Sequence, residues 1–525
     1  TLNNDGTISP ATVGTVGTLS ISGNLVQGAT GRVAVDLGGT GAGASDLLAV
    51  SGSISLGGTL DTTLLPIYNP ADADFVPVIS VGGTAAGGFA LTNNPAGFAA
   101  GYNLAAGEAV RLIYSTRGFT KIFTNAAGNL DWGTPANWGG ALPGASDTAL
   151  ISAGFAVDHN RGSTSIAGLT VNGANSLSVS GGTLSVSGDT SLGGSFTVSG
   201  TGTATLGGNV TGGGTVAVSG GTLTLGGAAS LGGLNLTGGL LDGTGALSVA
   251  GSFARTGAAA IGSGFSSISV TQATGNLVPG AMSAGRILLA TQDTASTLVV
   301  DGLLQAGADV QLAGSGGVRL LSGGAISSAA AGDAVVIDAG TGPFDNQAGA
   351  GALSAANGRW LVYSANPAND TVGGLPATFR QLNAPFGTTP QGAGSGLLYS
   401  QAATLTASLQ GSVSKVYDRN TAATVAPANY VVSGALATDL VVLNNPSAGT
   451  YTTAGTAATV QGAGTGKAVL VTGVTASVTD SATGIPVYGY QFDGTASGVV
   501  GGITPLTLVP TGSLVDQSVL GQATA

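Results

Sequence analysis

The segment SVSGGTLSVSGDTSLGG at residues 178–194 returns as AVSGGTLTLGGAASLGG at residues 217–233. The two copies agree at 11 of 17 positions and start 39 residues apart (217 − 178). Within each copy, apolar residues alternate with small residues, which is the period-two pattern of a β-strand, and glycines follow the short runs. A fixed repeat of this size is typical of solenoids, and 39 residues fit two coils of roughly 19 to 20 residues each. The repeat therefore predicts a parallel β-helix.

The same apolar-x-apolar triplet recurs between residues 166 and 253. Its members are Leu169 and Val171, Leu177 and Val179, Leu184 and Val186, Phe196 and Val198, Val216 and Val218, Leu223 and Leu225, and Leu247 and Val249. In a β-helix these side chains point inward and stack on the next coil about 4.8 Å away, while Ser and Thr face water. Glycine is needed at the corners, where the chain turns through positive φ.

The composition supports a folded β-structure and argues against several functions. Glycine accounts for 94 of 525 residues without the three-residue period of collagen, and 43% of the chain is hydrophobic, which disfavours disorder. Only 7% of residues are charged, and the net charge of −11 is thinly spread, so we expect no nucleic-acid partner. There is no cysteine, and no apolar run reaches the ~18 residues of a membrane helix. We expect no direct membrane insertion.

Residues 1–125 carry longer strands of the same kind, in which Leu19, Ile21, Val33, Val35, Leu48, Val50, Ile54 and Leu56 alternate with polar residues. The pattern D-x-L-x-V-x-G occurs as Asp46, Leu48, Val50 and Gly52. This segment resembles the β-helix passengers of autotransporters and of filamentous-haemagglutinin-like exoproteins. The resemblance implies a β-helix segment over 1–125.

Two further segments are similar to parts of the same exoproteins and define a second β-helix block at 126–402. DWGTPANWGGALPGASDTALI, residues 131–151, resembles a recurring insert, marked by Trp132, Asn137, Trp138, Pro143 and Asp147. GRWLVYSANPANDTVGGLPATFRQLNAPFG, residues 358–387, resembles the segment that closes haemagglutinin-like solenoids, marked by Arg359, Trp360, Tyr363 and Pro367. The closing segment is therefore expected at 358–400.

The pattern changes after about residue 403, where KVYDRNTAATV begins at Lys415 and a Gly-Ile-Thr-Pro sequence occupies 502–505. Residues 403–510 resemble a YDG module, whose usual Tyr-Asp-Gly reads Tyr417-Asp418-Arg419 here. We expect Arg419 to adopt an ordinary turn or to bear strain, with Asn420 taking the permissive position. Residues 511–525 read as the start of a further module or a tail. The fold class is thus all-β, a right-handed parallel β-helix (β-solenoid) followed by a small β-rich module.

Few residues have the types and spacings that catalysis or metal binding requires. The single histidine, His159, lies beside Asp158 and Arg161, and we interpret it as part of a surface turn because no triad spacing accompanies it. Asp72 and Asp74 form a loop acid pair without the pattern of an EF-hand. The glycines of residues 39–43 lack a Walker lysine. We therefore predict no catalytic, cofactor-binding or metal-binding residues, and no cofactor.

Aromatic residues leave two interpretations open. Trp132 and Trp138 could stack on sugar rings as a binding platform, or they could pack within a cap of the solenoid. Five tyrosines gather in the C-terminal module and are expected to fill its core. They are Tyr417, Tyr430, Tyr451, Tyr488 and Tyr490.

A rod of stacked coils predicts a mechanical rather than a catalytic function. We expect the non-catalytic shaft of an adhesin that mediates cell-surface or biofilm attachment. The alternatives are a self-assembling structural or sheath protein and a polysaccharide-degrading β-helix enzyme. The resemblance implies secretion to the outer surface of a Gram-negative bacterium through an outer-membrane β-barrel partner, and a glycan or protein receptor on a host or bacterial surface. Because the chain begins at Thr1 without Met or a signal peptide, we expect a mature or excised part of a longer protein.

Overall fold

The computed structural model describes residues 1–71, 74–102, 107–114, 118–152, 154–454 and 459–509. The described residues form β-strands and three short 3₁₀ turns, with no α-helix among them. None of them forms a helix long and apolar enough to span a membrane. The chain divides into two compact units, unit 1 from Thr1 to Pro376 and unit 2 from Ala377 to Ala525. The predicted all-β fold class is confirmed, and most strands of unit 1 pair in parallel.

The first part of unit 1 winds through three parallel sheets. Its strands are β1 (Leu2–Asn4), β2 (Thr7–Ile8), β3 (Thr18–Ile21), β4 (Leu25–Gln27), β5 (Arg32–Leu37), β6 (Leu47–Val50), β7 (Ile54–Leu56), β8 (Thr59–Leu64), β9 (Phe75–Val81), β10 (Ala85–Gly87) and β11 (Leu91–Asn93). The sheets have the orders β1-β4-β7-β10, β2-β5-β8-β11 and β3-β6-β9. Every third strand therefore stacks on its counterpart in the next coil, as a solenoid requires. Most of the predicted inward residues are buried, but Leu19 is 36% exposed.

An antiparallel hairpin follows these coils, which the sequence pattern did not predict. Strands β12 (Phe98–Tyr102) and β13 (Glu108–Tyr114) pair antiparallel, and β13 also runs antiparallel to β9. Both strands bury consecutive residues rather than alternate ones, among them Ala99, Ala100, Leu112 and Ile113. Thus residues 1–125 are not parallel coils throughout.

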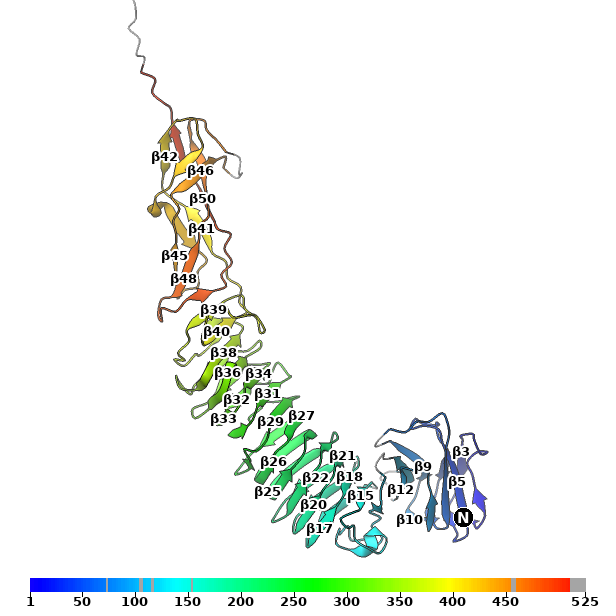
Figure 1. Cartoon of the computed structure of the whole chain (residues 1–525). Coiled ribbons are helices and arrows are strands. Elements are labelled where there is room, and N and C mark those ends of the chain that lie inside the picture. Colours follow the sequence, from blue (N-terminus) through cyan, green and yellow to red (C-terminus); the bar gives the residue numbers. More distant parts are fainter. Residues whose placement is uncertain (72–73, 103–106, 115–117, 153, 455–458, 510–525) are drawn as a thin grey trace, which may run out of the picture. The chain divides into compact units, whose positions relative to one another are not determined.

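The middle of unit 1 is one large parallel sheet in which successive coils pair in register (Figure 1). Its first strands are β14 (Lys121–Ile122), β15 (Thr148–Ile151), β16 (Ala156–His159), β17 (Ser163–Ile166), β18 (Gly168–Val171), β19 (Ser176–Val179), β20 (Thr183–Val186), β21 (Thr190–Leu192), β22 (Ser195–Val198), β23 (Thr203–Leu206), β24 (Val210–Thr211), β25 (Thr215–Leu225), β26 (Ala229–Gly243) and β27 (Ala246–Arg255). Leu184 pairs with Ala204, which pairs with Leu223. These steps are 20 (204 − 184) and 19 (223 − 204) residues, so the prediction that 39 residues form two coils is confirmed.

The glycines of the repeat serve the corners, as residues 182 and 221 show. Gly182 and Gly221 both have positive φ, at 67° and 64°. A Cβ on Gly221 would lie 2.0 Å from the carbonyl oxygen of Gly202 in the preceding coil. A side chain at this corner would clash with the backbone of the preceding coil, so glycine is required both for its conformation and for the close stacking.

Later coils are longer and use a further sheet. The remaining strands of unit 1 are β28 (Ala260–Ile261), β29 (Ser267–Gln272), β30 (Met282–Ala284), β31 (Ile287–Thr291), β32 (Leu298–Val300), β33 (Leu303–Ala306), β34 (Val310–Gly314), β35 (Val318–Leu320), β36 (Ala325–Asp338), β37 (Phe344–Asn346) and β38 (Leu353–Ser364). Strands β32, β35 and β37 form a separate parallel sheet. Val318 pairs with Phe344, a step of 26 residues (344 − 318), so the coil length is not constant along the chain.

Unit 2 combines a short parallel sheet with a mainly antiparallel module. Its strands are β39 (Phe379–Gln381), β40 (Gly396–Tyr399), β41 (Thr406–Leu409), β42 (Val413–Val416), β43 (Ala422–Thr424), β44 (Tyr430–Ser433), β45 (Asp439–Leu443), β46 (Ala448–Thr452), β47 (Gly464–Thr472), β48 (Ala476–Asp480), β49 (Val487–Tyr488) and β50 (Thr495–Thr504). Strand β39 pairs in parallel with both β40 and β49. The larger sheet runs β43-β46-β47-β50-β41-β44, while β45 and β48 form an antiparallel pair.

Candidate functional site

The two tryptophans proposed as a sugar platform are core residues. Trp132 is 1% exposed and Trp138 is 2% exposed, and their rings pack edge to face with centroids 4.6 Å apart. The indole N–H of Trp138 donates to the carbonyl oxygen of Trp132 at 2.9 Å. Phe123 packs edge to face on Trp138 at 5.1 Å. An exposed platform at these residues is therefore excluded in this fold. The two rings pack in the interior, as the alternative interpretation expected.

His159 is buried as well, so its interpretation as part of a surface turn was wrong. It is 1% exposed at the end of β16, directly beside Val179 of the next coil. Its Nδ1 lies 3.1 Å from the carbonyl oxygen of Gly181, and its Nε2 lies 3.1 Å from the hydroxyl of Thr164. Asp158 points the other way and accepts from the Ser180 hydroxyl at 2.7 Å. The histidine fills an inward ladder position with both ring nitrogens hydrogen-bonded.

The acidic residues singled out from the sequence have local structural contacts. Asp72 lies outside the described residues, while the Asp74 carboxylate accepts from the Tyr68 hydroxyl and the Ala71 amide, each at 2.9 Å. Asp46 is 1% exposed and accepts from the Gly17 amide at 2.7 Å. Burial raises the pKa of Asp46, although its backbone hydrogen bonds oppose the shift. Within the described part of the chain, no three His, Cys, Asp or Glu side chains cluster as a metal site.

The tyrosines of the module divide between two places. Tyr451 is fully buried in the core beside Val469, Val471 and Ala496, and its hydroxyl donates to the Val413 carbonyl oxygen at 3.0 Å. Tyr417 and Tyr430 pack against the same core and are partly buried. Tyr488 and Tyr490 are not in this cluster, so the expectation of one tyrosine core holds for three of the five residues.

The Tyr417-Asp418-Arg419 turn adopts the conformation that glycine would adopt. Arg419 has φ of 68°, in the left-handed region, whereas Asn420 is not among the residues with positive φ. The alternative in which Arg419 bears the strain is therefore the correct one. The Asn420 side chain instead accepts hydrogen bonds from Lys415 Nζ at 2.6 Å and from the Ala422 amide at 3.0 Å. These bonds join the turn to β42 and β43.

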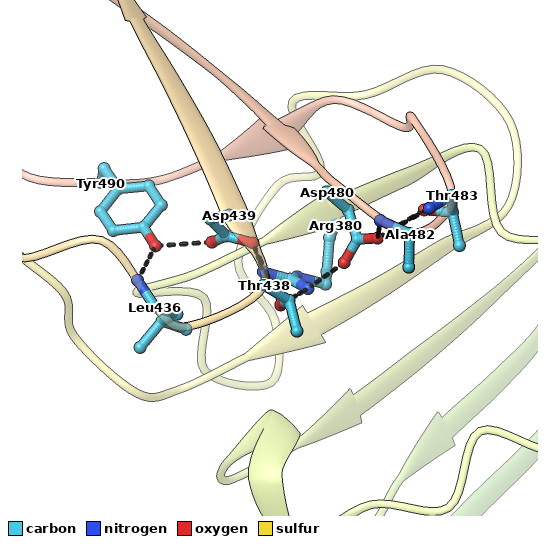
Figure 2. Close-up of polar contacts among 8 residues, drawn as sticks. All are labelled: Arg380, Leu436, Thr438, Asp439, Asp480, Ala482, Thr483 and Tyr490. Atoms are coloured by element: carbon cyan, nitrogen blue, oxygen red, sulfur yellow. Dashed lines mark hydrogen bonds and ion pairs between the residues drawn. The ribbon is translucent and has the colours of Figure 1, made fainter.

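A buried polar cluster surrounds Arg380 in unit 2 and was not predicted from the sequence (Figure 2). Arg380 lies on β39, and its guanidinium forms ion pairs with Asp439 at the start of β45 and with Asp480 at the end of β48. Nη1 lies 2.7 Å from Asp480. The Asp439 carboxylate also accepts from the Tyr490 hydroxyl at 2.5 Å, and that hydroxyl accepts from the Leu436 amide. We call these four side chains, Arg380, Asp439, Asp480 and Tyr490, the arginine clamp.

Burial makes the clamp electrostatically strong. The Arg380 side chain is 8% exposed and that of Asp439 is fully buried. Burial by itself raises the pKa of Asp480, but hydrogen bonds from Thr483 and Ala482 and the Arg380 charge outweigh it and leave the pKa below its usual range. Burial and the hydrogen bond to Asp439 raise the pKa of Tyr490 to about 12. The shifts keep the Asp480 carboxylate ionised and the Tyr490 phenol neutral at neutral pH.

The clamp connects distant parts of the sequence. Arg380 is 59 residues from Asp439 and 100 residues from Asp480 in the chain. Its contacts hold the short β39 strand against the β45-β48 pair, with each carboxylate saturated by donors. Sequence patterns could not reveal it, because pairing over such separations depends on the fold alone. The arrangement is suited to resist separation of these strands.

Comparison with protein-family models, with curated proteins and with solved structures finds no match for this chain.

Proposed function

We propose that the chain is part of the shaft of a secreted bacterial surface adhesin, a right-handed parallel β-helix that serves attachment without catalysis. The observation that carries the proposal is the inter-coil register of unit 1. Inward residues such as Leu177, Phe196 and Val216 pair from coil to coil, and all three are fully buried. Coils that stack only on their neighbours extend a protein in one direction, and length is the property that such a shaft supplies.

The surface charges of unit 1 support a structural role for its coils. Ion pairs join neighbouring coils, as Arg286 with Asp309 at 2.8 Å and Arg319 with Asp345 at 2.9 Å. The second pair occupies directly opposed positions on β35 and β37. These charged side chains thus form ion pairs between neighbouring coils and do not gather in a groove.

The arginine clamp supports load transmission within unit 2. A pulling force on β39 acts on the Arg380 ion pairs as well as on the backbone hydrogen bonds to β40 and β49. Buried ion pairs are costly to separate because the charges become unpaired in a poorly solvated place.

The resemblance noted in the sequence supports the cellular part of the proposal. The Trp360 segment and the Tyr417-Asp418-Arg419 turn resemble a closing segment and a YDG module of filamentous-haemagglutinin-like exoproteins. We propose that a separate outer-membrane β-barrel exports the chain to the surface of a Gram-negative cell. A host or bacterial surface glycan or protein is then its receptor.

A register-matched deletion tests the shaft. Removing residues 179–217 joins Ser178 to Val218 and deletes two whole coils, so the fold should persist and shorten by about 10 Å. Removing 30 residues from the same place is the control, because it breaks the register and should unfold unit 1. Bacteria displaying the intact chain or the 39-residue deletion should attach to epithelial cells or seed biofilm more than bacteria displaying the control.

Two results would contradict the proposal. One is a folded, displayed chain that adds no attachment over an empty display host. The other is release of reducing ends from a polysaccharide by the purified chain, which would assign it to the enzymes. Distances between labels on the first and last coils of unit 1 measure the shortening.

A further inference from the structure

A cleft of about 690 Å³ opens in unit 2 where three segments of the module meet. The turn 417–419 follows β42, Gly462 precedes β47, and Pro505 and Leu506 follow β50. The volume lies within the range of small-molecule sites, which is roughly 300–1,000 Å³. The arginine clamp is not part of its lining. The inference drawn from the cleft concerns unit 2 alone and does not depend on the proposed function of the solenoid.

Arg419 is the unusual residue of this cleft. Its backbone is in the left-handed region at φ of 68°, where a non-glycine residue costs on the order of 1 kcal/mol or more. The arginines of the solenoid that were described above pair with a carboxylate of the next coil. Among the residues that the structure describes, no carboxylate pairs with Arg419. Arg419 therefore lines the cleft, and among the described residues it combines a left-handed backbone with a guanidinium that pairs with no carboxylate.

The neighbouring carboxylate defines the second half of the site. Asp418 is exposed and lies 2.8 Å from Lys415 Nζ. The hydrogen bond from Lys415 is the main reason that the pKa of Asp418 lies below its usual range, so the carboxylate stays ionised at neutral pH. An ionised carboxylate accepts hydrogen bonds from hydroxyl groups and repels a bare anion. Asp418 Oδ1 already accepts from Lys415 and from the Asn420 amide, and Oδ2 accepts from the Asn420 side chain. A ligand that suits both residues carries a carboxylate for Arg419 and a hydroxyl that donates to Asp418 Oδ2.

The remaining lining is apolar and open. Leu506 is 55% exposed and Leu508 is 84% exposed, and the partly buried Tyr417 also lines the cleft. The C–H faces of a pyranose ring pack on such surfaces while its hydroxyls remain hydrogen-bonded. We infer that the cleft binds a carboxylated sugar, a uronic or sialic acid unit of an acidic saccharide, through the Arg419 guanidinium.

Arginine provides the geometry that this ligand needs. A guanidinium donates two parallel hydrogen bonds to one carboxylate, whereas a lysine acts as a point charge. The whole chain carries a net charge of −11 and should repel an acidic polymer, which favours binding at one place. A peptide with a free carboxylate meets the Arg419 requirement but offers fewer hydroxyl donors to Asp418.

Calorimetric titration of the full chain tests the inference. The probes are a galacturonate oligomer, sialyllactose, the fully methyl-esterified galacturonate oligomer, and a hexapeptide with a free C-terminal carboxylate. We expect binding of the galacturonate oligomer or of sialyllactose, and the one that binds identifies the sugar. The methyl ester should bind at least tenfold more weakly, because esterification removes the charge and keeps the ring.

Substitutions at one residue separate the charge from the fold. Arg419→Gly suits the positive φ, so it should retain or raise the thermal midpoint of unit 2 while reducing affinity at least tenfold. Arg419→Lys should bind with intermediate affinity. Arg319→Gln makes the same charge change on the solenoid and should leave binding unchanged.

Three results would overturn the inference. They are equal affinity in the Arg419→Gly chain, tighter binding of the hexapeptide than of either sugar, and no binding of either sugar by folded protein. None of them bears on attachment by the displayed solenoid deletion, so the two proposals fail separately.

Discussion

Unit 1 and unit 2 solve the problem of a stable interior in opposite ways. In unit 1 the interior is repeated, so that Leu184, Ala204 and Leu223 occupy one column and each is supported by similar residues above and below. In unit 2 the interior contains groups that occur once, such as Tyr451 and the buried Arg380. Repetition spreads stability along a chain, whereas a single buried ion cluster concentrates it.

The difference teaches where substitutions should act. A coil of unit 1 contacts its neighbours, so a single substitution that keeps the register should disturb only the adjacent coils. The clamp joins residues 100 positions apart, so its loss should reach all of the strands that it connects. Hydrogen exchange followed by mass spectrometry resolves the two units in one full-length chain.

The largest expected effect comes from Arg380→Ala. It leaves Asp439 and Asp480 buried without their cation, which should cost about 3–5 kcal/mol of unfolding free energy in unit 2. Denaturant unfolding monitored by exchange in each unit measures the loss. Arg286→Ala, which breaks a more exposed pair in unit 1, is the control and should cost less than about 1 kcal/mol. Similar losses for both variants would contradict a special role for the clamp.

The next effect tests the repeat. Leu223→Ala removes a fully buried side chain from the column and should cost about 2–5 kcal/mol. Faster exchange should be confined to β23, β25 and β26, whose residues pair around it. Ser248→Ala, an outward position in the same unit, should leave exchange unchanged. Destabilisation of unit 2 by Leu223→Ala would show that the comparison between units is wrong.

A pH-dependent loss should appear in unit 2 through Tyr490. Its phenol has a pKa of about 12 in the folded chain, against about 10 in an unfolded one. Its contribution is complete below pH 10 and is lost as the pH rises through 12, because the unfolded chain releases the proton first. Comparison of unfolding between pH 9 and 12 with the Tyr490→Phe chain isolates this residue. If the unfolding free energies of the two chains change equally with pH, Tyr490 is not the source of the pH dependence.

A substitution in an inward column of unit 1 should stabilise that unit without affecting unit 2. Thr190 is fully buried in the column between Leu169 and Val210, and its hydroxyl has no hydrogen-bond partner among the described residues. Thr190→Val should therefore raise unfolding free energy by about 1 kcal/mol. Thr190→Ser retains the hydroxyl and should lower it. A loss of stability in the valine chain would indicate that the hydroxyl is satisfied.

The smallest expected effect is at the surface ladder. Arg319→Gln breaks the ion pair with Asp345. Because the Arg319 side chain is 49% exposed, the substitution should cost between 0 and about 1 kcal/mol of unfolding free energy. The loss should disappear in 0.5 M salt, since salt screens exposed pairs. A salt-independent loss above this range would mean that the pair is effectively buried.

Sequence patterns predicted the solenoid because its interactions are local and repeated. Alternation identified Leu169, Val171 and their counterparts as inward residues, and the 39-residue repeat predicted the coil length. The burial of single residues was harder to predict. Trp132 and Trp138 have the same chemistry on a surface or in a core, and His159 stands in a polar sequence although its position in β16 is an inward one.

The amino-acid sequence by itself determined the all-β class, the inward columns and the two-coil repeat, since strand periodicity and glycine corners are properties of short segments. Only the tertiary structure decided the antiparallel β12–β13 hairpin, the burial of His159, the strain at Arg419 and the arginine clamp. The physical reason is the sequence separation over which each interaction acts. Backbone preferences act within a few residues, but burial and ion pairing depend on which distant segments the fold brings together.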